Sequence, residues 1–563
     1  MRDGVRLAVD LYLPRTMAAG ARLPTILLQT RYFRSHRVAW PFSMFWAGFL
    51  EPRIARYIRQ GYAFVTVDVR GSGASFGTRE LEWSPAEVRD GAEIVDWIVA
   101  QPWSNGKVGT TGASYEGTAS ELLLSNRHPA VKAAAVQSGM FDLYADMVFP
   151  GGIELAPFVA FWGRATAAQD SNRFSSMLSG FPKLVYRGVK PVAGDSGETL
   201  LAEAMKEHLQ NFNMPSLTAT QKFRTPGDVI EQTGPVAKRE LIEQSGAAIY
   251  SISGWYDGGL ANSAIRRFLS IRTPKSRLIL GPWSHQGENL SPFAAKLEDF
   301  DRTAEIIRFF DWTLKGVDNG VEREGPVRYY TVGEERWKSA PTWPPPGATS
   351  RTLYFAATHA LSDRADTASR AADTYAVDLT TGTGQETRWN NLTALDIKHS
   401  MPRDRRERDQ KLLVYDGAPL AADLEVTGHP MVTLHLESTE PDGAVFVYLE
   451  DVDPNGAVHY VTEGELRVIH RRIRPEAAAY TFPGPYRTFA KADAEPLVRG
   501  EIATLEFDLL PISYLFRAGH SIRVAIAGAD ADHFTTVSPS APVFTVYRDA
   551  NHPSSIMLPV MPR

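Results

Sequence analysis

The sequence predicts an α/β protein that carries a helical insertion and a C-terminal antiparallel β-sandwich. Three observations favour this fold class. Strand and helix patterns alternate over the first 140 residues, the pattern becomes helical from about residue 141 to 239, and short strands separated by turn residues fill the chain beyond residue 350. Alternating strands and helices are typical of a mostly parallel sheet with helices on both faces.

The first strands and helices are predicted from apolar runs and their spacing. Residues 23–29 and 62–68 are compact runs of apolar, β-branched or aromatic side chains, as buried strands are. The intervening residues 54–61 have helical spacing and end in glycine, a common stop signal. A second helix, 88–99, is predicted to place its apolar side chains close to one face: Val88, Ile94, Val95, Trp97 and Ile98.

The alternation continues on both sides of the insertion. Its further elements are strand 107–112, a short apolar helix near 122–124, strand 131–137, strands 247–253 and 276–282, and helix 303–315. We therefore expect four segments, which are the first part of the α/β domain (1–141), the helical insertion (142–240), the second part of the α/β domain (241–325) and the β-sandwich (326–563).

A proline-rich connection, residues 341–347, leads into the predicted sandwich. Strand patterns recur there between turn signals and helical spacing is nearly absent, as in antiparallel sandwiches. The predicted strands include 352–355, 432–436, 444–449, 503–507 and 521–527. Within this part, residues 403–411 alternate in charge, which predicts a solvated loop.

Composition excludes several classes of protein. The 563 residues are 44% hydrophobic and 22% charged, so the chain can bury a large core and is not predicted to be disordered. Its net charge of −5 is not the positive charge that attracts nucleic acid or an anionic membrane. The absence of cysteine excludes disulfides, thiolate metal sites and a cysteine nucleophile.

The sequence leaves the compartment and the oligomeric state open. No stretch approaches the roughly 18 apolar residues that span a bilayer, and the most apolar region, residues 40–50, is predicted to form a buried helix or a pocket wall. Residues 1–12 alternate apolar and polar side chains like a strand, unlike a secretory signal. A cytoplasmic protein, an exported protein whose leader was removed, a monomer and a homo-oligomer are all compatible with these features.

The strongest local signal for chemistry is Ser114, within the segment Gly109–Gly117. The serine lies between a predicted strand and a predicted helix, with Gly112 two residues before it. Such a turn exposes the hydroxyl and places the next backbone N–H where it can stabilise an oxyanion. The usual pattern has glycine two residues after the serine, but Glu116 is there and the glycine follows at Gly117. The alternative is a glycine-rich turn that contains an incidental serine.

A serine nucleophile needs an oriented base, and in chains with this turn the order is serine, acid, histidine. Asp257 and His285 follow the ends of two consecutive predicted strands, in glycine-rich loops. Because ligands bind at the carboxyl ends of parallel strands, Ser114, Asp257 and His285 are predicted to form a catalytic triad at one sheet edge. Taken singly, each is more often an ordinary turn residue. His36 is the nearest competitor for the base, because it follows the strand that ends at Thr30.

Several segments together resemble a known family. Gly112–Gly117, Gly254–Gly258, Gly281–His285, Asp68–Ser75 and Pro102–Gly109 are similar to the signatures of the cocaine esterase family, which includes α-amino acid ester hydrolases, glutaryl cephalosporin acylases and X-prolyl dipeptidyl peptidases. The resemblance covers nearly the whole chain. It implies an α/β-hydrolase domain with an inserted helical cap and a C-terminal jelly-roll. It also implies a serine hydrolase that cleaves a small-molecule ester or amide through an acyl-enzyme, with no metal or organic cofactor.

The resemblance further implies an oxyanion hole. In the family, a tyrosine hydroxyl after an early strand acts together with the backbone N–H of the residue after the nucleophile, and Tyr32 and Tyr115 are at these positions. The sequence departs from the family at Arg31, because proline often precedes this tyrosine. Without the resemblance, Tyr32 would be interpreted as a packed aromatic residue at the end of a strand.

Aromatic residues predict the walls of a substrate pocket. They are Trp46, in the segment after Tyr32, and three residues of the insertion, Phe158, Phe161 and Trp162. Trp162 is near the position of a pocket tryptophan in the family. Such clusters are more often core packing than pocket lining, and that alternative remains.

The residues after Asp257 bear on the substrate. Relatives that hydrolyse α-amino acid esters bind the free amine with carboxylates, part of them just after the catalytic aspartate, whereas here Gly258, Gly259 and Leu260 follow. Asp142 and Asp146 could lie near such a site, but an acidic pair at the start of a helix is more often a helix cap, and we prefer that interpretation. We therefore expect a carboxylic ester without a free α-amine. The alternatives are an X-prolyl dipeptidyl peptidase, a cephalosporin-type acylase or, from another class, a binding protein whose jelly-roll accompanies a vestigial hydrolase.

Overall fold

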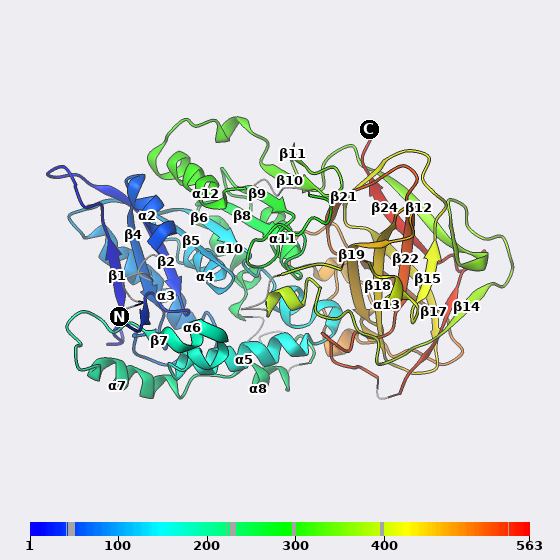
Figure 1. Ribbon diagram of the computed structural model, residues 1–563, viewed down its shortest axis with the longest axis horizontal. Coiled ribbons are helices and arrows are strands. Elements are labelled where there is room, and N and C mark those ends of the chain that lie inside the picture. The colour runs from blue at the N-terminus through cyan, green and yellow to red at the C-terminus, as the bar shows by residue number, and fades with distance from the viewer. Residues whose placement is uncertain are drawn as a thin grey trace.

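The computed structural model describes residues 1–563 apart from 41, 43–50, 221, 226–231, 295–299, 394–398, 403, 539 and 563. The α/β domain and the cap lie at one end of the long axis, and the sheet-rich C-terminal domain lies at the other (Figure 1). None of the helices in the described ranges has both the length and the apolar character needed to span a lipid bilayer.

In the described part of the chain, a nine-stranded sheet forms the centre of the α/β domain. From edge to edge it contains β1 (Val9–Tyr12), β4 (Ala63–Asp68), β2 (Leu23–Thr30), β5 (Ser104–Ala113), β6 (Val131–Gln137), β8 (Ala248–Gly254), β9 (Arg277–Gly281), β10 (Val327–Thr331) and β11 (Arg336–Ala340). The sheet is parallel from β4 to β10, and β1 and β11 pair antiparallel at its edges. This confirms the predicted parallel sheet, but β10 and β11 extend it beyond the boundary that we expected at residue 325.

Helices pack on both faces of the sheet. They are α2 (Glu51–Arg59), α3 (Pro85–Val99), α4 (Tyr115–Leu123), α10 (Arg239–Gln244), α11 (Leu260–Ser270) and α12 (Arg302–Phe310). Ile26 packs in one cluster with the apolar residues of α2 and α12, whereas its neighbour Leu27 packs in a second cluster with those of α3 and α10. The two clusters are separate because successive side chains of a strand point to opposite faces.

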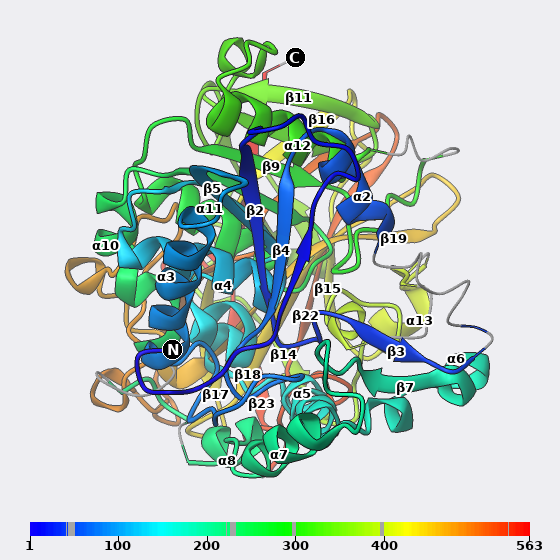
Figure 2. The same cartoon turned by 90° about the vertical axis from the view of Figure 1, so that its left-hand side faces the viewer.

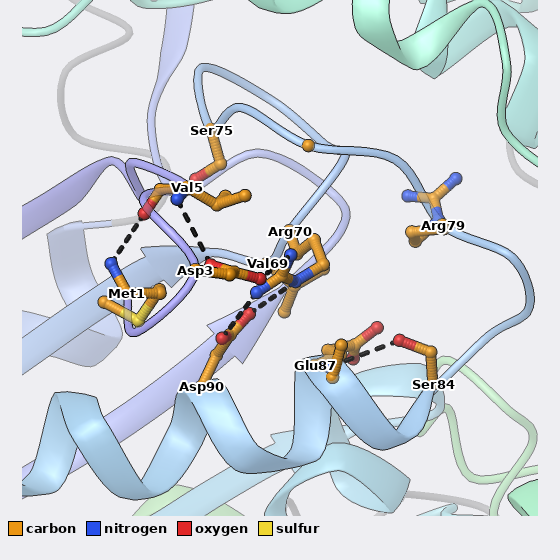
Figure 3. Close-up of polar contacts among 12 residues, drawn as sticks. Met1, Asp3, Val5, Val69, Arg70, Ser75, Arg79, Ser84, Glu87 and Asp90 are labelled. Atoms are coloured by element: carbon orange, nitrogen blue, oxygen red, sulfur yellow. Dashed lines mark hydrogen bonds and ion pairs between the residues drawn. The ribbon is translucent and has the colours of Figure 1, made fainter.

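Helix α3 shows both the strength and the limit of the apolar pattern. It begins at Ser84, whose hydroxyl accepts a hydrogen bond from the Glu87 backbone N–H at 3.2 Å (Figure 3). The predicted face buries Ile94, Val95 and Ile98, but the prediction was wrong for Trp97, which is 42% exposed. Because a helix turns by roughly 100° per residue, Trp97 lies at the edge of this face.

The loop after β4 and the N-terminal residues dock on the same helix. Arg70 donates two hydrogen bonds of 2.8 Å to Asp90 of α3 and lies 2.7 Å from Asp3 (Figure 3). The Met1 amino group donates to the Val5 carbonyl oxygen at 2.7 Å. These contacts fix the start of the chain beside the loop that leads into α3.

The cap lies between β6 and β8. Its helices are α5 (Ala156–Asp170), α6 (Gly180–Val185), α7 (Thr199–His208) and α8 (Met214–Thr218). The sequence pattern showed no strong strand there, yet β7 (Tyr186–Val189) pairs antiparallel with β3 (His36–Val38). Figure 2 shows this ribbon beside α6, away from the central sheet. The pairing joins the cap to the loop after β2.

The C-terminal domain is the predicted β-sandwich. Its strands are β12 (Thr349–Ala356), β13 (Ala360–Ser362), β14 (Ala372–Ala376), β15 (Leu413–Asp416), β16 (Leu424–Gly428), β17 (Met431–Ser438), β18 (Ala444–Val452), β19 (Val458–Arg467), β20 (Ala503–Asp508), β21 (Ile512–Phe516), β22 (Ser521–Ala527), β23 (Val543–Tyr547) and β24 (Ser555–Val560). Every strand that we predicted for this part lies within one of them.

The prediction of a solvated loop at residues 403–411 was wrong for Arg405 and Asp409, whereas five of the eight described residues of this run are exposed. A short helix, α13 (Arg406–Asp409), forms there, and Arg405 and Asp409 are buried. Arg405 donates a hydrogen bond of 2.5 Å to Glu450 of β18. Alternating charge does not distinguish a solvated run from one whose charges are paired inside the protein.

The two domains share one continuous core. Trp255, just after β8, donates a hydrogen bond of 2.8 Å to the Tyr330 carbonyl oxygen and packs against Trp343 at a ring-centre distance of 5.7 Å. Arg388 of the C-terminal domain donates to the carbonyl oxygen of Gly258 at 3.3 Å. The C-terminal domain therefore supports the loop that follows β8, where Asp257 lies.

Candidate active site

Ser114 lies in the turn between β5 and α4, with φ 61° and ψ −123°. Non-glycine residues rarely adopt this region, so the turn is strained. Its neighbours must be small: a Cβ on Gly112 would lie 2.3 Å from the Cβ of Glu116, and one on Gly117 would lie 2.6 Å from the Gln137 carbonyl oxygen. These glycines let the strand, the serine and the helix follow one another with no intervening loop.

Asp257 and His285 lie in the loops after the neighbouring parallel strands β8 and β9. Nδ1 of His285 is 2.7 Å from Oδ1 of Asp257, and Asp257 is fully buried. Burial alone would lower the pKa of His285, but the charge and the hydrogen bond of Asp257 outweigh it and raise that pKa. In neutral His285 the contact keeps the proton on Nδ1, which donates a hydrogen bond to the carboxylate, and it leaves Nε2 as the basic nitrogen.

The second oxygen of Asp257 has its own donor, which the sequence analysis missed. The Ser138 hydroxyl donates to Oδ2 at 2.5 Å, and the Ser253 hydroxyl lies 3.5 Å from the same atom. Ser138 directly follows β6 and therefore reaches the same edge of the sheet. Its place after a predicted strand was the available signal.

Ser114, His285 and Tyr32 line one cavity of about 440 Å³. Burial raises the pKa of Tyr32 far above its usual value, while Arg31 and the Ser114 hydroxyl act in the opposite direction. Tyr32 is therefore protonated and can donate a hydrogen bond. The Ser114 hydroxyl interacts with the Tyr32 phenol, and among the described residues no direct hydrogen bond joins it to His285. Contacts between nucleophile and base are often loose before substrate binds.

Tyr115 follows Ser114 as the first residue of α4, and it is not among the described residues that line the cavity. Its hydroxyl donates to Glu87 at 2.5 Å, its ring stacks on Trp83 at 4.8 Å, and its carbonyl oxygen accepts the Trp83 indole N–H at 3.1 Å. Burial raises the pKa of Glu87 to about 8. These contacts fix the backbone of Tyr115, and with it the N–H at the start of the helix.

Three of the four predicted aromatic residues line the cavity. Phe158, Phe161 and Trp162 come from α5 of the cap, and the Trp162 ring meets Tyr32 edge-on at 6.1 Å. Trp46 lies outside the described residues. The prediction of a buried helix or pocket wall at residues 40–50 was wrong for Trp40, which is 79% exposed.

The other residues considered from the sequence were His36, as a competing base, and the acidic pair Asp142 and Asp146. His36 lines the cavity, burial lowers its pKa to about 4, and its Nδ1 faces the Tyr186 hydroxyl at 3.0 Å. Asp142 and Asp146 are buried and form ion pairs with Arg224 and Arg266. Neither aspartate is among the described residues that line the cavity.

The fold and the site define the chain as an α/β-hydrolase. Its parallel sheet carries a serine in a strained turn after β5, and an aspartate and a histidine in the loops after β8 and β9. Comparison with known families agrees. The family model described as X-Pro dipeptidyl-peptidase (S15 family) matches residues 3–287, and that of the X-Pro dipeptidyl-peptidase C-terminal non-catalytic domain matches residues 319–556. The chain belongs to the X-Pro dipeptidyl-peptidase (S15) family.

Individual relatives cover the whole chain. It is 48% identical to a "Putative serine esterase" of Mycobacterium tuberculosis, over 100% of this chain and 94% of that protein. It is 27% identical to the cocaine esterase of a Rhodococcus species, over 100% and 97%. A CocE/NonD family hydrolase of Staphylococcus aureus shares the fold, with a TM-score of 0.73, 18% identity and coverage of 100% and 92%. The chain is thus a serine hydrolase rather than a binding protein with a vestigial hydrolase domain.

Proposed function

We propose that this protein hydrolyses a carboxylic ester through an acyl-enzyme on Ser114, with His285 as the base and Asp257 as its orienting acid. The observation that carries the proposal is the 2.7 Å contact between His285 Nδ1 and Asp257 Oδ1, beside the cavity that Ser114 lines. That contact leaves Nε2 of His285 to accept the serine proton.

The proposed reaction has two stages. His285 takes the Ser114 proton as Oγ attacks the acyl carbon, and the oxyanion accepts hydrogen bonds from the Tyr32 hydroxyl and the Tyr115 N–H. The C–O bond to the leaving group then breaks, and the alcohol departs with the proton from His285. Water, activated by the same base, attacks the acyl-enzyme and releases the acid, and Ser114 regains its proton.

The assignment to an ester rather than an amide follows the relatives that are named as esterases. The second candidate is removal of X-Pro dipeptides, which the family's name suggests. A dipeptidyl peptidase must bind a free amine, yet Gly258, Gly259 and Leu260 follow Asp257 and offer no charge. Comparing kcat/KM for a neutral 4-nitrophenyl ester and for Gly-Pro 4-nitroanilide separates the two. A strong preference for the anilide would reverse the assignment.

The nucleophile is tested with Ser114→Ala, which should lose nearly all ester hydrolysis and all labelling by a fluorophosphonate probe. Ser125→Ala is the matched control, because this hydroxyl lies outside the cavity lining and donates to the Leu122 carbonyl oxygen at 2.7 Å. The control should keep full activity and labelling. Undiminished turnover of an activated ester by Ser114→Ala, with the fold intact by circular dichroism, would refute the proposal.

A further inference from the structure

Two arginines line the cavity of the proposed catalytic residues and have no part in the mechanism above. Arg53 of α2 and Arg302, the first residue of α12, line the same cavity as Ser114 and His285. Arg302 donates a hydrogen bond of 3.1 Å to the carbonyl oxygen of Gln286, the residue after His285. One of the two cations is thus anchored directly beside the loop of the proposed base.

An ion pair outside the cavity holds the two arginines near each other. Arg56 of α2 donates two hydrogen bonds, of 2.8 and 2.6 Å, to the two carboxylate oxygens of Asp301. Arg53 precedes Arg56 by one helical turn, so the two side chains lie on neighbouring parts of one face. Asp301 directly precedes Arg302. The pairing of α2 with α12 therefore brings a second pair of residues, Arg53 and Arg302, to one side of the cavity.

The positive charges of Arg53 and Arg302 repel each other. Burial and the charge of Arg53 lower the pKa of Arg302, whereas the charges of Asp257 and Glu288 act in the opposite direction and are outweighed. The carboxylates that line the cavity have other partners, because Glu82 pairs with Arg31, and Glu116 interacts with Thr30 and the Ala113 backbone. Glu116 lies close enough to Arg53 for the arginine's charge to lower its pKa, although burial has the larger effect and raises it. Within the described ranges of the chain, neither Arg53 nor Arg302 forms an ion pair.

We propose that Arg53 and Arg302 bind a carboxylate of the substrate, so that the preferred ester carries a second, ionised acid group. The inference rests on the proposed ester hydrolysis and adds the substrate class. A guanidinium group binds a planar carboxylate through two parallel hydrogen bonds, and an anion between two arginines relieves their mutual repulsion. The same two charges repel a free α-amine, in accord with the uncharged residues that follow Asp257.

Matched substrates that differ in one charge test the proposal. For the acyl side they are mono-4-nitrophenyl adipate and its methyl ester, with release of 4-nitrophenol as the readout. For the leaving-group side they are 4-acetoxybenzoate and methyl 4-acetoxybenzoate. We expect kcat/KM to favour the charged member by about tenfold or more in one of the two series. Raising the salt from about 0.05 to about 0.5 M should reduce this preference, because salt screens the attraction.

Variants then assign the preference to the two arginines. The double variant Arg53→Gln/Arg302→Gln should bring the ratio of charged to neutral substrate close to one, and Arg53→Gln alone should lower it. Arg302→Lys keeps the charge and should retain much of the ratio, even if Arg302→Gln proves unstable. Arg308→Gln is the control, because Arg308 lies on the same helix but pairs with Glu324. It should change neither the ratio nor the activity.

The outcomes separate this inference from the proposed function. A wild-type ratio at or below one in both series, or a ratio that the double variant leaves unchanged, overturns the carboxylate site. Ester hydrolysis that depends on Ser114 would stand in either case. Conversely, if Ser114→Ala retains turnover, the proposed function fails whatever the charge preference is.

Discussion

Ser138 donates a hydrogen bond to Oδ2 of Asp257 at 2.5 Å, the oxygen that His285 does not contact. The carboxylate is fully buried and has a separate donor on each oxygen. Two donors in different directions fix the plane of the carboxylate, and so the plane in which the His285 ring is held. Ser138 has φ 47°, and its main chain donates to the Ile252 carbonyl oxygen of β8 at 2.7 Å, so its position is itself restrained.

Ser138→Ala should therefore lower kcat/KM by about tenfold, the order of one hydrogen bond to a buried charge. Ser253→Ala is the matched control, since its hydroxyl is 3.5 Å from the same oxygen and contributes less. Steady-state rates on a neutral 4-nitrophenyl ester measure both variants. Equal losses in the two variants would show that Ser138 has no special role in orienting Asp257.

Tyr32→Phe removes the proposed side-chain donor of the oxyanion hole and leaves the ring that packs on Trp162. Loss of one such donor costs about 2.7–4 kcal/mol of barrier, so kcat should fall by about 10² to 10³ while KM changes little. Tyr186→Phe is the comparison, because this tyrosine also lines the cavity but binds His36. A kcat for Tyr32→Phe within a few-fold of the wild type would remove Tyr32 from the mechanism.

The pH dependence follows from the direction of the His285 pKa. The base must be neutral to accept the serine proton, so kcat/KM should rise with pH through a pKa above 6.5. Asp257 and Glu288 raise this pKa, whereas burial and Arg302 lower it. Asp257→Asn removes the main raising charge, so the rising limb should move to lower pH and the plateau should fall by orders of magnitude. If the rising limb of kcat/KM stays at the same pH in Asp257→Asn, a group other than His285 produces it.

The sequence was sufficient for the fold because its signals are local. Strands such as 62–68 and helices such as 88–99 were recognised from spacing and glycine positions. The same signals did not predict the extension of the sheet to β10 and β11 or the pairing of β7 with β3, because strand pairing joins segments that are distant in the chain. The position of Ser114 between a strand and a helix, and of Asp257 and His285 after strands, was predictable for the same local reason.

The missed features depend on partners far away in the chain. Arg405 was predicted to be solvated because its partner, Glu450, lies in the distant strand β18. The neighbouring positions of Arg53 and Arg302 follow from the docking of α2 on α12, which no pattern within either helix indicates.

Arg31, the residue before Tyr32, is fully buried and joins the Tyr32 loop to the cap. It forms an ion pair with Glu82 and lies 3.3 Å from Asp170, the last residue of α5. Arg79 donates to both oxygens of Asp170 at 2.9 Å. Because α5 also carries Trp162, which touches Tyr32, helix α5 contacts the Tyr32 loop through both Asp170 and Trp162.

Arg31→Met should therefore affect catalysis as well as stability. The substitution takes one ion-pair partner from each of two buried carboxylates, and such a loss typically destabilises the fold by about 3–5 kcal/mol. It also removes a link between the Tyr32 loop and the cap, so kcat should fall by more than KM rises. Arg31→Lys keeps the charge but cannot pair with both carboxylates in the same way. Its stability and its kcat should therefore lie between those of Arg31→Met and those of the wild type. Arg405→Met, which breaks an equally buried pair with Glu450 in the C-terminal domain, should lower the thermal midpoint to a similar extent with kcat unchanged. If Arg31→Met and Arg405→Met lose stability alike and both retain the wild-type kcat, Arg31 stabilises the fold and does not position Tyr32.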